Sequence, residues 1–149
     1  MAIMTGSWFT RYPADHLIVG ISRGTPRNAG PGYRMYRKLQ PGPWFNSVSV
    51  EEYRRRYQAE ILDRLDPKAV AAEIAALAGE RVPVLCCFER PHTGQWCHRA
   101  LAAAWLAEAL GEPVPEFGFE GLVQAEHPLR PPGAAAADLM PPQGRLDLA

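Results

Sequence analysis

The sequence predicts an α/β protein: a single small three-layer domain in which a mostly parallel sheet of about four strands carries helices on its faces. Two short apolar runs, 17–21 and 82–88, are typical of strands that are covered on both sides of a sheet. Stretches of helix-forming residues with capping signals lie between and after these runs, as in alternating β and α units. A chain of 149 residues has room for one such domain with its own core.

Four segments are expected to form strands. Residues 17–21 and 82–88 are almost continuously apolar and are therefore expected inside the sheet. Residues 1–5 are apolar but short, which suits an edge strand. Residues 114–119 are expected to form the last strand, also at an edge, because the prolines in and beside this segment cannot donate hydrogen bonds to a neighbour.

Three segments are expected to form helices. In the first, Ser49 precedes Glu52 by three residues, which is the capping-box pattern, and the helix is expected to run to about Leu65. The second is expected over residues 66–79, because an Asp-Pro pair begins this stretch and a glycine ends it. The third is expected over residues 97–111, which are rich in alanine and leucine and again end in glycine.

The domain is expected to cover residues 1–119. Residues 120–149 contain no phenylalanine, tyrosine or tryptophan and are rich in proline and alanine. A segment of this composition cannot bury enough apolar surface to order itself. We therefore expect residues 120–149 to form a flexible, disordered tail.

Composition also bears on where the protein works. No stretch is apolar for long enough to span a membrane, and the first residues lack the basic and apolar regions of a signal peptide. The three cysteines are an odd number and two of them are adjacent, which suits a reducing compartment better than a disulfide framework. A cytoplasmic protein without a membrane partner is expected, and nothing in the sequence sets its oligomeric state.

The stretch after the strand at 82–88 carries the candidate chemistry. Glu89 follows this strand, and Cys97, His98 and Arg99 begin the next helix after a polar loop. Ligands of parallel sheets bind beyond the carboxyl ends of the strands, near helix N-termini whose free amides favour anions. Cys97 is the candidate nucleophile, with a thiol pKa that the helix N-terminus and its neighbours would lower. His98 and Glu89 are the candidate proton-transfer groups.

Three arginines are expected to complete this site as an anion clamp. Arg23 and Arg27 follow the strand at 17–21, so they would lie at the same rim of a parallel sheet, and Arg99 belongs to the helix start. Guanidinium groups fork around carboxylates and phosphates. The sequence therefore predicts binding of a small anionic or phosphate-bearing ligand, and it leaves open whether thiol-dependent chemistry makes the chain an enzyme.

Three alternatives stay open. A metal site could use Cys87, His92, Cys97 and His98. However, the adjacent residues Cys97 and His98 would point about 100° apart on a helix, and the sequence has no Cys-x-x-Cys pair. No metal or cofactor is therefore expected. The same cysteines could simply be buried in the core. Segment 11–45 holds six basic residues and one acidic residue, so a non-enzymatic module that binds nucleic acid or protein through it is the competing function.

The chain also resembles a known family. Residues 85–89 (Leu-Cys-Cys-Phe-Glu), followed by 97–99 (Cys-His-Arg) and a small-residue helix, are similar to the pattern of the domain of unknown function 488 family. Residues 22–27 and 52–57 resemble further segments of it, so that the resemblance spans roughly residues 16–110. The Cys-His-Arg triplet is the most specific part. The resemblance implies a cytoplasmic α/β domain and no established reaction.

Overall fold

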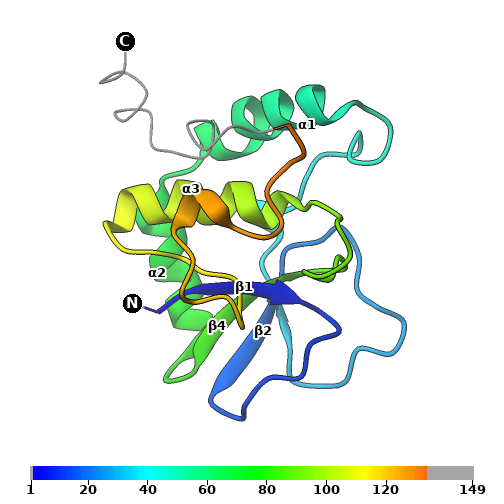
Figure 1. Ribbon diagram of the computed structural model, residues 1–149. Helices are drawn as coiled ribbons and strands as arrows, with labels where there is room; N and C mark the ends of the chain where they lie inside the picture. The colour runs from blue at the N-terminus through cyan, green and yellow to red at the C-terminus, as the bar shows by residue number, and fades with distance from the viewer. Residues whose placement is uncertain (1, 134–149) are drawn as a thin grey trace.

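The sheet confirms the expected fold class. The computed structural model describes residues 2–133, and within them four strands form one sheet in the order β1-β4-β2-β3 (Figure 1). All neighbouring strands in it are parallel. The strands are β1 Met4–Ser7, β2 His16–Gly20, β3 Arg34–Met35 and β4 Val82–Cys87.

The positions of the strands follow the sequence pattern with two exceptions, the first of which is β3, a two-residue strand in a segment where no strand was expected. β4 pairs with β1 on one side and with β2 on the other, so both strongly apolar runs lie inside the sheet and β1 lies at its edge, as expected. The expected strand at 114–119 is wrong. Glu116 makes an isolated bridge to Thr5 of β1 instead, because the neighbouring prolines interrupt the pattern of N–H donors that a ladder needs.

The three expected helical segments are all present. The first is α1 Val50–Arg56, which continues through a π-helical turn, η2 Tyr57–Ile61, and a 3-10 turn, η3 Leu62–Arg64. The others are α2 Pro67–Ala78 and α3 His98–Leu110, and two short 3-10 turns are η1 Arg37–Leu39 and η4 Gln124–Glu126. None of the helices within residues 2–133 has the length and apolar character needed to cross a membrane.

Capping residues fix where these helices begin and end. The Ser49 hydroxyl accepts a hydrogen bond of 3.1 Å from the Glu52 amide, and the Asp66 carboxylate accepts one of 3.2 Å from the Lys68 amide. Gly111 ends α3 with a φ of 68°, a left-handed conformation that glycine adopts without strain. The expected starts of the first two helices and the expected end of the third are thus confirmed, whereas the third helix begins at His98 with Cys97 as its N-cap.

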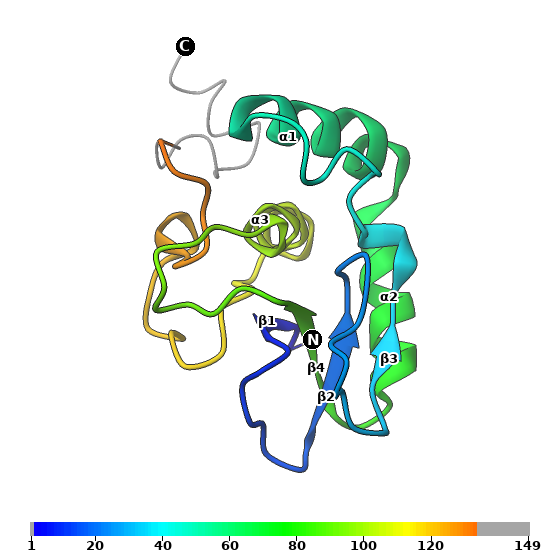
Figure 2. The same ribbon diagram turned by 90° about the vertical axis from the view of Figure 1, so that its right-hand side faces the viewer.

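The helices and the loops cover opposite faces of the sheet. On one face, Val19 and Leu85 of the strands pack with Leu106 of α3 in the main core, which also holds side chains of α1 and α2. On the other face, Trp8 and Tyr33 from the loops that precede β2 and β3 pack against the sheet in a smaller cluster. Figure 2 views α3 nearly end-on, with the sheet below it and α1 above it. Helices were expected on both faces, but loops form one of the two covering layers.

A buried polar network ties the segment after α3 to the rest of the domain. The carboxylate of Glu116 accepts two hydrogen bonds from the Arg99 guanidinium, of 2.9 and 2.7 Å, and one of 2.7 Å from the Thr5 hydroxyl. The His127 Nε2 lies 2.8 Å from that hydroxyl. Burial lowers the pKa of His127 to about 4, so its imidazole is neutral at pH 7.

The expected flexible tail from residue 120 is wrong for residues 120–133. Leu129 is fully buried in the main core, and its carbonyl accepts a hydrogen bond of 2.9 Å from the Cys97 amide. The buried apolar contact and the hydrogen bond together hold this segment against the start of α3. The rest of the expected tail, residues 134–149, lies outside the described residues.

Candidate functional site

A cavity lies where the sequence predicts the site. It has a volume of about 470 Å³ and lies at the carboxyl ends of β2 and β4, beside the N-terminus of α3; we call it the α3 cavity. Four of the predicted site residues line it, namely Arg23, Glu89, Cys97 and His98. The other lining residues are Ser22, Gly24, Pro41, Phe45, Tyr53, Cys87, Phe88 and Trp96.

Cys97 is the N-cap of α3 and points into the cluster at the bottom of the cavity. Its backbone is extended, with φ −151° and ψ 146°, and its Sγ accepts a hydrogen bond of 3.4 Å from the Arg99 amide. The expectation that Cys97 and His98 point apart is therefore wrong. The 100° rotation applies to two helical residues, whereas Cys97 precedes the helix, and its Sγ lies 3.7 Å from His98 Nδ1.

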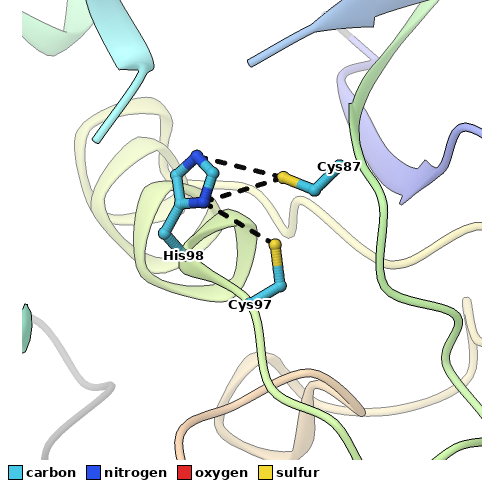
Figure 3. A group of neighbouring side chains, drawn as sticks. All are labelled: Cys87, Cys97 and His98. Atoms are coloured by element: carbon cyan, nitrogen blue, oxygen red, sulfur yellow. Dashed lines mark hydrogen bonds between the residues drawn. The ribbon is translucent and has the colours of Figure 1, made fainter. Parts of the chain in front are cut away.

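His98 is held by contacts with three parts of the fold. Its Nε2 lies 3.0 Å from the carbonyl of Ile21, at the end of β2, and its ring packs edge-on against Tyr57 with 5.3 Å between centroids. Its Nδ1 lies 3.7 Å from Cys87 Sγ, at the end of β4 (Figure 3). Figure 3 shows the imidazole facing both thiols, so Cys87, Cys97 and His98 converge although they come from two elements.

The thiol of Cys97 does not have the lowered pKa that its place at a helix N-terminus suggests. Cys97 is 4% exposed, and desolvation raises its pKa well above the usual value; the neighbouring thiol of Cys87 adds to this effect. The positive charge of Arg99 acts in the opposite direction but does not outweigh burial. The lowered pKa predicted for Cys97 is therefore wrong for the protein alone, since the low dielectric of the core disfavours a thiolate.

Arg23 and Glu89 place opposite charges at the cavity wall. Arg23 is exposed, donates a hydrogen bond of 3.1 Å to the carbonyl of Pro41, and lies with its guanidinium 5.9 Å from the centre of the Phe45 ring. A guanidinium has five N–H donors, and the bond to Pro41 uses one of them. Glu89 is partly exposed, so its carboxylate can reach both the cavity and the solvent.

Arg99 and Arg27 do not line the α3 cavity. Arg99 is fully buried: its guanidinium pairs with Glu116 and also donates a hydrogen bond of 2.9 Å to the carbonyl of Glu89. It therefore fixes the backbone of the cavity wall instead of facing a ligand. Arg27 lines a second cavity of about 750 Å³ on the loop-covered face, together with Trp8 and Tyr33.

Two features of the site escaped the sequence analysis. Cys87 was named only within a metal alternative that also included His92, yet it joins Cys97 and His98 without it; the alternation of β4, which sends Cys86 to the opposite face, was the signal that could have placed Cys87. The aromatic wall was also missed. Its centre is Tyr53, whose ring contacts Trp96 edge-on with 4.7 Å between centroids.

The comparisons with known proteins leave this site to be interpreted on its own chemistry. No family model, no curated protein and no solved structure matches the chain.

Proposed function

We propose that the protein binds a small molecule with a carboxylate or phosphate group and an apolar, ring-sized body in the α3 cavity. The observation that carries this proposal is the cavity itself: a hollow of about 470 Å³ with an arginine at its wall and the start of a helix at its floor. Its volume lies within the range of small-molecule sites, about 300–1,000 Å³.

Two features favour an anionic group on the ligand. Arg23 presents a guanidinium at the cavity, and guanidinium donors match the geometry of carboxylates and phosphates. The N-terminus of α3, a helix of 13 residues, adds a positive dipole end at Cys97 and His98. Glu89 would orient the ligand in the cavity. Its carboxylate repels the anionic group of the ligand and accepts a proton or hydrogen bond from a ligand hydroxyl or amine.

The aromatic wall favours a ring on the ligand. Phe45, Tyr53, Phe88 and Trp96 line the cavity, and their faces and edges can pack against a flat apolar body. In this proposal Cys97 and His98 form the floor beneath the ligand. We also propose that the chain belongs to the domain of unknown function 488 family, on the basis of the Cys-His-Arg triplet that follows β4.

Binding of simple aromatic anions tests the proposal. Phenyl phosphate and benzoate, titrated calorimetrically, should bind more tightly than benzyl alcohol or benzylamine. Arg23→Ala should weaken the binding of phenyl phosphate by about 10- to 100-fold, since a charge-assisted hydrogen bond contributes about 1.5–3 kcal/mol to the binding free energy. Arg27→Ala is the matched control, because Arg27 is an exposed arginine of the same loop that lines the other cavity. Equal losses in both variants, or equal binding of all four compounds, would contradict the proposal.

A second candidate function rests on exposed aromatic residues near the same rim. Phe9, Phe45 and Phe88 are 48%, 42% and 39% exposed, and the guanidinium of Arg90 lies 5.0 Å from the centre of the Phe9 ring. Exposed rings beside arginines can stack on the bases of single-stranded nucleic acid. This function is supported if the protein binds a labelled oligonucleotide with an affinity that falls steeply with salt and is lost in Phe9→Ala. Absence of binding at low salt would exclude nucleic-acid binding.

A further inference from the structure

The cluster of Cys87, Cys97 and His98 has the composition and spacing of a metal site. Within residues 2–133, the sulfur and nitrogen atoms of these three side chains all lie within 4.8 Å of one another. His98 Nδ1 is 3.7 Å from the Sγ of each cysteine, and Cys87 Sγ is also 3.9 Å from Nε2. In a tetrahedral site with Zn–S and Zn–N bonds of ordinary length, ligand atoms lie about 3.5–3.8 Å apart, so the two Nδ1–Sγ distances fit a shared ion.

The tautomer of His98 is the one that a ligand needs. Nε2 lies 3.0 Å from the carbonyl oxygen of Ile21, and a carbonyl can only accept, so Nε2 carries the hydrogen. With the hydrogen on Nε2, the neutral form of the ring has its lone pair on Nδ1, the nitrogen that lies beside the two thiols. A hydrogen bond from the distal ring nitrogen to a backbone carbonyl is the usual way in which proteins orient a metal-binding histidine.

Charge balance also fits a divalent ion. Cys87, Cys97 and His98 are all at least nine-tenths buried, at 1%, 4% and 6% exposed. Two thiolates and a neutral imidazole around a divalent cation form a neutral assembly, which a buried position tolerates, whereas two thiolates alone would not be tolerated. Thiolate and imidazole ligands select zinc or a similar soft ion over magnesium or calcium.

We propose that Cys87, Cys97 and His98 bind one zinc ion at the floor of the α3 cavity. All three residues line this cavity, so the protein supplies three ligands and the fourth position faces the space where a small molecule would lie. Three protein ligands and an open position are typical of zinc sites that bind water or a ligand group. The proposal goes beyond the anion-binding function and does not rest on it, since its observations concern the three ligand atoms alone.

Metal titration of the full-length, reduced chain tests the site. After removal of metal with a chelator and transfer to anaerobic, phosphate-free buffer, the protein should bind one equivalent of Zn²⁺. Co²⁺ in its place should give a thiolate-to-cobalt charge-transfer band and the intense visible bands of tetrahedral cobalt. Binding should release about two protons, because both thiols must lose theirs. Absence of the charge-transfer band in the native chain would overturn the proposal without any variant.

Variants locate the ion and separate it from ligand binding. Cys87→Ser, Cys97→Ser and His98→Gln should each weaken zinc binding by at least about 100-fold, because loss of an outer-shell partner alone costs about 10- to 100-fold. Cys86→Ser is the matched control: it alters the adjacent buried cysteine on the other face of β4 and should retain the ion and its spectrum. Equal losses for Cys86→Ser and Cys87→Ser would overturn the assignment. Phenyl phosphate is titrated separately into chelator-treated protein. The anion-binding proposal is thereby tested without zinc, and failure of either proposal leaves the other one standing.

Discussion

The substitution Glu116→Gln should lower the free energy of unfolding by about 3–5 kcal/mol, the cost of leaving a buried charge without its partner. The side chains of Arg99 and Glu116 are 0% and 1% exposed, and two hydrogen bonds of 2.9 and 2.7 Å join them. Glutamine keeps the size and shape of glutamate, so the change removes the negative charge without opening a cavity. The guanidinium of Arg99 would then remain charged in the core.

Urea and thermal unfolding measure this loss. For a chain of 149 residues, the change should lower the melting temperature by about 10 °C. Glu126→Gln is the control, since Glu126 is exposed and should change stability by less than about 0.5 kcal/mol. The double variant Arg99→Met/Glu116→Leu should cost less than Glu116→Gln alone, because it removes both charges. If Glu116→Gln lowers the free energy of unfolding by less than about 1 kcal/mol, the reasoning that Arg99 and Glu116 form a desolvated ion pair is refuted.

Three further predictions follow from burial and backbone geometry. Alkylation of Cys97 in the metal-free folded protein, mapped by peptide mass spectrometry, should be slow at neutral pH, because burial raises the thiol pKa; rapid labelling at pH 7 would contradict this. The His127 pKa is about 4 when folded, against about 6.5 when unfolded, so the unfolded state binds more protons between these values and stability should fall by up to about 3 kcal/mol as the pH drops from 6.5 to 4. Urea unfolding of His127→Gln should show a smaller loss of stability over this pH range than the unmodified protein does. An equal loss of stability would contradict the assignment of this pH dependence to His127. Gly111→Ala should lower the free energy of unfolding by about 1 kcal/mol, because alanine is strained at a φ of 68°. An unchanged melting temperature in this variant would contradict a left-handed conformation at the end of α3.

The local structure could be predicted because its causes are local. Ser49 and Asp66 cap helices through amides two or three residues away, and Gly111 ends α3 by its own conformation. The apolar runs identified the two interior strands for the same reason, since burial on both faces requires apolar residues at every position. The position of the α3 cavity at the ends of β2 and β4 also agrees with the parallel topology, which brings these strand ends to one edge of the sheet.

The partners of individual side chains could not be predicted, because they depend on contacts between distant segments. Arg99 pairs with Glu116, which the return of the chain beside β1 brings to it, and so it is not available to a ligand. Arg27 lies on the loop-covered face, since the connection from β2 to β3 runs over that face, whereas Arg23 is still near the strand end. Cys97 was treated as helical although it is the N-cap, which hid its convergence with His98.

An amide NMR titration with phenyl phosphate tests the central claim most directly, because it locates the ligand on the fold. The α3 cavity predicts that the shifted amides cluster at residues 22–24, 87–89 and 96–98, where β2 and β4 end and α3 begins. Shifts that cluster instead at residues 26–33, around the second cavity, would contradict the claim that the α3 cavity is the binding site.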